Sequence, residues 1–184
     1  MTLWLVRHAQ PLIANGICYG ALDMDADPGA TQVAAQALAL ELPHGLDVRV
    51  SPLRRCQQLA HALGELRADL RFDNDPRLRE MDFGHWEGVA WADIPRAVID
   101  AWTIDFATHR FGGKESANEV LVRVAGAWDE LSPRGDTLWI THSGVAQVAT
   151  LLHRGTRHVE QAKDWPTSTL KYGAWMKFQI EPSE

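Results

Sequence analysis

The sequence predicts an α/β fold, a three-layer α/β/α sandwich around a largely parallel sheet, and three observations favour it. Short apolar runs alternate with longer segments of helical periodicity, as a parallel sheet with helical crossovers requires. Residues 3–6 are apolar at every position, which is typical of a central strand covered on both faces. Residues 170–180 are apolar at every second position, which predicts an antiparallel edge strand with one face in water.

The first half of the chain continues this pattern. A helix is predicted over residues 30–42, which are rich in alanine and end before Pro43. Its apolar positions at helical spacing are Val33, Ala37 and Leu40 or Glu41. A second strand is predicted over residues 46–50, and a helix begins near Leu53. One face of that helix is expected to pack on the sheet through Cys56, Leu59, Ala60, Leu63 and Leu66.

The middle of the chain changes character after a short strand predicted near residues 70–72. Residues 81–116 are rich in Trp, Gly, Asp and Pro and contain no long periodic run. They predict an excursion over the top of the sheet, with short helices around residues 89–107. Because loops on a rigid scaffold commonly carry specificity, we expect residues 9–25 and residues 83–116 to contact the organic part of a ligand.

The second half returns to regular elements. A helix is predicted over residues 117–131, with Ser116 as its N-cap, and a strand over residues 136–141. The first of these is expected to bury Val120, Val124, Ala127 and Trp128. After His142, another helix is expected to bury one face made of Val145, Val148, Ala149 and Leu152.

Composition limits the classes of function. The chain has 184 residues, 46% of them hydrophobic, which fits one domain over residues 1–184. A net charge of -6 argues against a nucleic-acid partner, which is normally met by a basic face. No apolar stretch approaches the roughly 18 to 20 residues of a membrane helix, and no signal peptide is visible, so we expect a cytoplasmic protein without a membrane partner. Cys18 and Cys56 are expected to be reduced.

Four motifs carry chemistry, and most of them follow predicted strands. Arg7-His8 follows the first strand, Ser51-Pro52-Leu53-Arg54-Arg55 the second, and His142-Ser143-Gly144 the strand over residues 136–141; Glu80 opens the excursion. Open parallel sheets bind ligands at the carboxyl ends of their strands, so we expect these side chains to meet there.

In that order the motifs resemble the histidine phosphatase superfamily, which includes the phosphoglycerate mutases. The resemblance rests on Arg7-His8-Ala9, on residues 51–58, on residues 78–88 and on His142-Ser143-Gly144. It implies a phosphoglycerate mutase-like fold.

Further details resemble the alpha-ribazole phosphatase branch: residues 16–20 with Asp23, the run Arg55-Cys56-Gln57, the Glu80 segment, and residues 113–116 leading to Arg123-Val124. Three positions depart from the usual pattern, namely Ala9, Pro11 and Lys114.

The chemistry of each residue type suggests its role. His8 is the candidate nucleophile: it would attack phosphorus and form a phosphohistidine that water then hydrolyses, provided that flanking arginines keep its ring neutral. Arg7 and Arg55 would bind the phosphoryl oxygens through paired donors. The family spacing selects Arg55, and Arg54 is then expected to be a solvated helix residue.

The remaining candidates act around the phosphoryl group. The resemblance gives His142 a role in binding phosphate and stabilising the transition state; the alternative is a helix-capping histidine. Glu80 is the candidate general acid for the leaving oxygen. Glu87 is expected to make structural hydrogen bonds, Asp82 is left undecided, and of the other histidines His85 is the candidate for lining the pocket. No metal or cofactor is expected, because the sequence lacks metal-ligand spacing and a phosphate-binding glycine loop.

The motifs therefore predict a phosphomonoester hydrolase, and the resemblance to the alpha-ribazole phosphatase branch implies alpha-ribazole 5'-phosphate of cobalamin biosynthesis as its substrate. A broad-specificity phosphatase and a phosphoglycerate mutase are the enzymatic alternatives, and a catalytically silent phosphate-binding module is the alternative of another class. The expected partner is a small phosphorylated metabolite, and a homodimer is left open.

Overall fold

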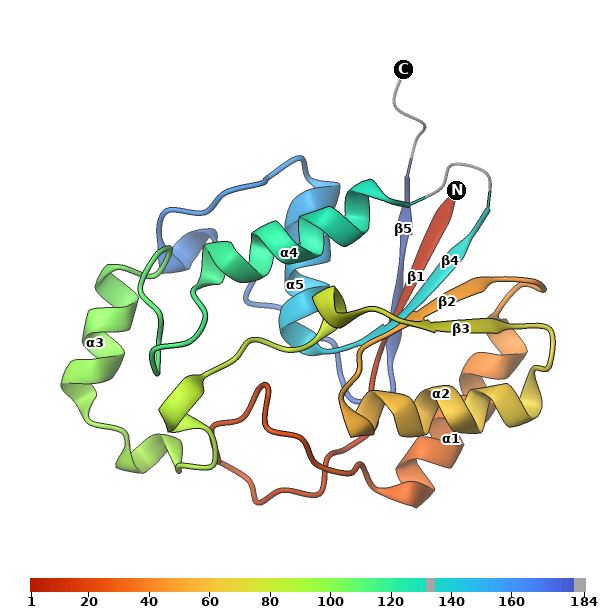
Figure 1. Cartoon of the computed structure of the whole chain (residues 1–184), viewed down its shortest axis with the longest axis horizontal. Helices are drawn as coiled ribbons and strands as arrows, with labels where there is room; N and C mark the ends of the chain where they lie inside the picture. The colour runs from red at the N-terminus through yellow and green to blue at the C-terminus, as the bar shows by residue number, and fades with distance from the viewer. Residues whose placement is uncertain (132–134, 181–184) are drawn as a thin grey trace.

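A computed structural model describes residues 1–131 and 135–180 (Figure 1). Within these residues, five strands form one sheet in the order β3-β2-β4-β1-β5. The strands are β1 (Thr2–Arg7), β2 (Asp47–Val50), β3 (Arg71–Asn74), β4 (Thr137–Thr141) and β5 (Trp175–Gln179). β5 pairs antiparallel with β1 at one edge, and the other pairings are parallel. The predicted parallel sheet with an antiparallel edge strand is confirmed.

Helices cover both faces of this sheet. They are α1 (Pro28–Glu41), α2 (Arg54–Leu66), α3 (Arg96–Ile104), α4 (Ala117–Asp129) and α5 (Ser143–His153). Figure 1 shows α1 and α2 on one side of the sheet, α4 and α5 on the other, and α3 apart from the sheet at one end of the molecule.

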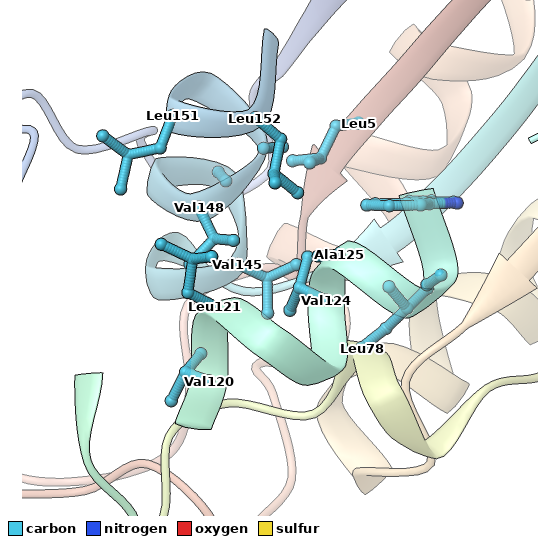
Figure 2. Close-up of a cluster of buried hydrophobic side chains, with 14 of the residues drawn as sticks. Leu5, Leu78, Val120, Leu121, Val124, Ala125, Val145, Val148, Leu151 and Leu152 are labelled. Carbon is cyan, nitrogen blue, oxygen red and sulfur yellow. The ribbon is translucent and has the colours of Figure 1, made fainter. Parts of the chain in front are cut away.

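Side-chain alternation along the strands builds a separate core on each face. In β1, Trp4 and Val6 pack with α1 and α2, whereas Leu3 and Leu5 pack with α4 and α5. Figure 2 shows side chains of α4 and α5 converging with Leu5. Because both faces are buried, the strand needs apolar residues at every position, as its sequence has. The three-layer arrangement is confirmed.

Two helices begin at the caps that the sequence supplies. Ser116 forms a capping box with Glu119, in which each side chain accepts a hydrogen bond from the other residue's backbone N–H. Asp27 caps α1 by accepting a hydrogen bond from the backbone of Ala30 at 2.7 Å. The predicted role of Ser116 is confirmed.

The apolar spacing in α1 does not mark its buried face. Val33 and Leu40 are 67% and 88% exposed. The buried face carries mostly small residues, namely Thr31, Ala34, Ala35 and Leu38. The exposed apolar residues and the buried small residues both recur at helical spacing. The buried face carries the smaller side chains because α1 packs closely against α2. In α2 the predicted apolar face is confirmed except for Leu66, which is 43% exposed at the end of the helix.

The C-terminal strand is shorter than its alternation predicted. β5 begins only at Trp175, because the chain turns at Gly173, whose φ is +70°. The backbone N–H of Gly173 bonds to the carbonyls of Arg7 and His8, both at 3.1 Å. The apolar residues before the turn therefore lie in a loop beside the end of β1.

Residues 81–116 contain α3 and short 3₁₀ turns at Gly84–Trp86 and Trp91–Asp93. They have an aromatic core in which Phe111 is fully buried and stacks on Trp102, with ring centroids 4.5 Å apart. Backbone hydrogen bonds between Cys18 and residues 88 and 89, each 2.8 Å long, join the excursion to the loop after β1.

Cys18 and Cys56 are both buried and free. In the described residues, no helix has the length and apolarity needed to cross a membrane.

Candidate active site

The carboxyl ends of β1, β2 and β4 bring His8, Ser51 and His142 together at one edge of the sheet. Backbone hydrogen bonds hold this edge: the N–H of His8 donates to Thr141 and that of Ser51 to Ile140, both at 3.0 Å. The rings of His8 and His142 lie 5.0 Å apart between centroids. The fold thus brings together His8 and His142, which are far apart in the sequence.

The contacts of His8 define which ring nitrogen carries the hydrogen. Nδ1 lies 2.7 Å from the carbonyl oxygen of Ala9, and a carbonyl can only accept, so Nδ1 donates. Nε2 accepts a hydrogen bond from Nε of Arg55 at 3.2 Å. Burial, the Arg55 charge and, more weakly, the Arg7 charge lower the pKa of His8 to about 3. The ring is neutral, and its available lone pair is on Nε2.

Arg55, rather than Arg54, lies beside His8. Its side chain is fully buried, and its guanidinium donates to the carbonyls of Leu22 at 2.9 Å and Gly20 at 2.6 Å. Arg54 is exposed and pairs with Asp25 at 2.9 Å, as a solvated helix residue would. The structure therefore places beside His8 the arginine that the family spacing selected.

Glu87 holds the loop that receives Arg55. Its carboxylate accepts backbone hydrogen bonds from residues 20, 21, 22 and 83, at 2.8 to 2.9 Å. A Cβ at Gly20 would lie 1.8 Å from the carbonyl oxygen of Met81, so this loop needs glycine there. The structural role predicted for Glu87 matches these bonds.

Arg7 leaves β1 on the side of the C-terminal segment. Its Nη1 donates to the carbonyl of Leu170 at 2.7 Å, and its guanidinium lies 3.8 Å from the ring centre of Tyr172. The hydroxyl of Tyr172 bonds to that of Tyr19 at 2.6 Å. Nε of Arg7 is buried and has no hydrogen-bond partner among the described residues.

His142 is fully buried at the start of α5. Its Nε2 lies 2.7 Å from the hydroxyl of Ser51 and 3.5 Å from the sulfur of Cys56. Its Nδ1 has no partner in residues 1–131 and 135–180. His142 occupies the N-cap position of α5, but its ring makes no capping bond to the helix. Burial, with smaller contributions from His8 and Arg55, lowers the pKa of His142 well below its usual value.

Glu80 reaches the same edge from the start of the excursion. Its carboxylate accepts hydrogen bonds from the backbone of Gly144 and of Met81, both at 3.1 Å. A Cβ at Gly144 would lie 2.4 Å from Oε1 of Glu80, so this approach depends on the glycine. Asp82 instead caps the turn at Gly84, at 2.8 Å, and does not line the cavity described next.

A cavity of about 500 Å³ opens from this edge. Its polar end is formed by Arg7, His8, Glu80, Ser143 and Gly144. Most of its wall is apolar and much of it aromatic: Ile17, Tyr19, Met81, Phe83, Trp91, Trp102, Phe106, Ala117, Val120 and Trp165, with Gln147 and Thr169. His85 is exposed, packs on Trp86 and does not line this cavity, so that prediction is wrong.

The sequence reasoning missed the part of the wall that comes from α5 and the C-terminal segment. Trp165 and Gln147 are joined there by a hydrogen bond of 3.1 Å from the indole N–H to the amide oxygen. A usable signal was present, because Trp165 lies outside every predicted strand and helix. A tryptophan in such a position needs an apolar partner, which a cavity wall supplies.

The family model described as "Histidine phosphatase superfamily (branch 1)" matches residues 3–182. The chain belongs to this family. It is a phosphatase, as its relatives' names also indicate. A Hydrogenobacter thermophilus protein named "Putative phosphoserine phosphatase 2" is 32% identical over 161 residues, covering 83% of this chain and 78% of that protein. A Mycobacterium tuberculosis glucosyl-3-phosphoglycerate phosphatase is 37% identical over 66% of this chain and 56% of its own length.

Solved structures agree with the fold of this histidine phosphatase. A mycobacterial glucosyl-3-phosphoglycerate phosphatase in complex with VO₃ has a TM-score of 0.79 and 25% identity, covering 96% of this chain and 90% of that one. The alpha-ribazole phosphatase of Shigella flexneri has a TM-score of 0.82 over 98% of this chain and 91% of its own. Its 24% identity shows the shared fold.

Across the described part of the chain, no three His, Cys, Asp or Glu side chains come together as a set that could hold a metal ion. Independence of metal stays a prediction, and chelation tests it.

Proposed function

We propose that this phosphatase hydrolyses phosphate monoesters through a phosphohistidine on His8. The observation that carries this is the neutral, buried ring of His8, whose Nδ1 is fixed by Ala9 and whose Nε2 lone pair lies beside Arg55. Nε2 would attack phosphorus while the bond to the ester oxygen breaks. Water would then attack the phosphohistidine, releasing phosphate and restoring the lone pair on Nε2.

Arg55 would change partners when substrate binds. Without substrate, its Nε donates to the nitrogen that must attack. A phosphoryl group is a stronger acceptor because it carries a negative charge, so it would take this hydrogen bond and free the lone pair. Arg7 and Nδ1–H of His142 would donate to the other phosphoryl oxygens, because each has a buried nitrogen without a partner among the described residues.

Glu80 is proposed as the general acid. It lines the cavity beside His8, and two backbone N–H groups hold its carboxylate in place. In the first step it would give a proton to the departing alkoxide, and in the second it would take one from the attacking water.

Trapping the phosphoenzyme tests this mechanism. We expect an acid-labile, base-stable phosphoryl group on the wild-type protein after a quench with ³²P-labelled substrate. His8→Ala should lose both this label and turnover, and His85→Ala should retain both because His85 is exposed outside the cavity. Turnover in His8→Ala would exclude the covalent route.

Comparing leaving groups tests Glu80 separately. A sugar alkoxide needs a proton to leave, whereas nitrophenolate leaves unaided. Glu80→Gln should therefore slow a ribose phosphate far more than p-nitrophenyl phosphate, and Arg55→Ala should slow both equally because it binds the shared phosphoryl group. A burst experiment must first show that phosphoenzyme formation is the slow step. Equal slowing by Glu80→Gln would remove Glu80 as the acid.

For the substrate we propose alpha-ribazole 5'-phosphate, a ribose phosphate that carries a flat aromatic base. The aromatic wall supports this choice, since Trp91, Trp102 and Trp165 offer surfaces on which such a base can stack. Among the described lining residues, Arg7 at the phosphoryl end is the sole Arg or Lys. Phosphoserine, glucosyl-3-phosphoglycerate and 3-phosphoglycerate each carry a carboxylate, for which this wall offers no second cation. The lack of a second cation among the described lining residues also disfavours a mutase.

A substrate panel tests this assignment. We expect the highest kcat/KM for alpha-ribazole 5'-phosphate among that ester, phosphoserine, glucosyl-3-phosphoglycerate and p-nitrophenyl phosphate. Trp102→Ala should lower kcat/KM for the aromatic nucleotide and leave phosphoserine unchanged. Similar values for all esters would favour the broad-specificity phosphatase, and failure to hydrolyse any of them would favour the silent phosphate-binding module.

A further inference from the structure

Ser51 is a buried residue whose side chain the proposed mechanism does not yet use. It follows β2, it is fully buried, and its hydroxyl lies 2.7 Å from Nε2 of His142. Its backbone is fixed on both sides, by the bond from its N–H to Ile140 at 3.0 Å and by the bond from the Gln57 side chain to its carbonyl at 2.7 Å. The hydroxyl therefore meets the histidine in a defined position.

A single hydrogen lies between the Ser51 oxygen and Nε2, and counting partners indicates its owner. The Ser51 oxygen accepts a hydrogen bond from the backbone N–H of Leu53, at 3.4 Å, and its hydroxyl hydrogen is a separate donor that needs an acceptor. If Nε2 donated instead, the Ser51 hydrogen would need another acceptor. Among the described residues, the alternative acceptor for the Ser51 hydrogen is the adjacent sulfur of Cys56, and sulfur is a weak acceptor.

We propose that Ser51 is a positioning residue, which donates to Nε2 of His142 and thereby holds the ring hydrogen on Nδ1. A neutral imidazole carries one hydrogen, so occupying Nε2 as an acceptor forces the other nitrogen to be the donor. Burial keeps the ring neutral, because it lowers the pKa of His142. The buried Nδ1 then has a hydrogen and no partner in residues 1–131 and 135–180, which suits a donor kept for a ligand.

The consequence for catalysis rests on the proposed function. With the hydrogen on Nδ1, His142 can donate to a phosphoryl oxygen whose negative charge grows in the transition state. With the hydrogen on Nε2, Nδ1 would instead present a lone pair to that oxygen and repel it. Ser51 would thus affect the rate without touching the substrate.

Nitrogen-15 NMR of the ligand-free, histidine-labelled protein tests the tautomer directly. We expect His142, assigned by comparison with His142→Gln, to show a protonated Nδ1 and an unprotonated Nε2. The opposite tautomer, or an equal mixture of the two, would overturn the proposal. This measurement needs no activity, so a protein with the expected tautomer that hydrolyses no ester would refute the phosphatase mechanism and leave the tautomer assignment standing.

Kinetics then test whether the tautomer matters. In Ser51→Ala we expect kcat and kcat/KM for p-nitrophenyl phosphate to fall together by about tenfold or more, with KM nearly unchanged, because the lost interaction belongs to the transition state. The His142 hydrogen should become distributed over both nitrogens in the same variant. Ser51→Thr, which keeps the hydroxyl, should restore most of kcat.

Cys56→Ala is the matched control. It removes the other side chain that contacts Nε2, at 3.5 Å, and leaves Ser51 in place. It should keep the tautomer and most of kcat. If Cys56→Ala lowered kcat as much as Ser51→Ala, or if Ser51→Ala kept the wild-type tautomer, packing rather than hydrogen donation would explain the effect and the proposal would fail.

Discussion

The burial of His8 should make the stability of the protein depend on pH in a range where carboxylates contribute little. His8 has an ordinary pKa of 6.5 in the unfolded chain and about 3 in the folded protein. Since the folded value is the lower one, acid favours the unfolded state, which binds a proton that the folded state does not. The contribution of His8 is complete above pH 6.5 and declines as the pH falls from there towards 3.

The size of the effect follows from these two values. Each pH unit below the unfolded pKa costs about 1.4 kcal/mol until the folded pKa is reached. Going from about pH 7.5 to about pH 5 should therefore remove about 2 kcal/mol of unfolding free energy through His8 alone. His142 adds a loss of the same sign, because burial lowers its pKa as well. Carboxylates with depressed pKa values, such as Glu119 at about 2, act at lower pH.

Urea unfolding of three proteins at both pH values measures the effect. The wild type should lose about 2 kcal/mol more than His8→Asn between about pH 7.5 and about pH 5, because asparagine does not titrate. His85→Asn should behave like the wild type, since its side chain is exposed. Equal losses in the wild type and His8→Asn would show that His8 is not held neutral, and the argument for its nucleophilicity would lose its basis.

Three further outcomes follow from the site. Hydrolysis of p-nitrophenyl phosphate should survive exhaustive EDTA treatment and be inhibited by vanadate, which can take the geometry of the transition state; a strict need for added metal would contradict the proposed site. Gly144→Ala, whose Cβ would press on Glu80 at 2.4 Å, should slow alkyl phosphates by about 10- to 100-fold, and p-nitrophenyl phosphate much less. Glu87→Gln should lower the unfolding free energy by about 2 kcal/mol in urea titrations, because four backbone N–H groups lose a charged acceptor; an unchanged midpoint would show that these bonds add little.

The sequence predicted the layers and the sheet well, because period-2 and period-3.6 patterns report directly on burial. The predictions were least accurate where two features of the sequence indicate different structures. In α1, alanines and larger apolar residues both recur at helical spacing, and only the distance to α2 decides which set is buried. At the C-terminus the alternation continues through Leu170 and Tyr172, yet a turn at Gly173 ends the strand.

The polar end of the site was more predictable than the rest of the cavity. His8, Ser51 and His142 follow strands, and the parallel sheet alone brings strand ends together. The aromatic wall is assembled from the loop after β1, the excursion and the loop after α5. The relative placement of these segments depends on tertiary contacts such as that between Trp165 and Gln147. No local periodicity reports on such contacts. The polar residues proposed to bind the phosphoryl group were therefore predictable from the sequence, whereas the wall proposed to contact the organic half of the substrate was not.

A series of hydrogen bonds connects motifs that are far apart in the sequence. Glu87 binds the backbone N–H groups of residues 20–22, and the carbonyls of Gly20 and Leu22 receive the guanidinium of Arg55. Arg55 in turn contacts Nε2 of His8. A change at Glu87 should therefore affect His8 through the loop and Arg55. Glu87 does not line the cavity, yet these hydrogen bonds connect it to His8, which does.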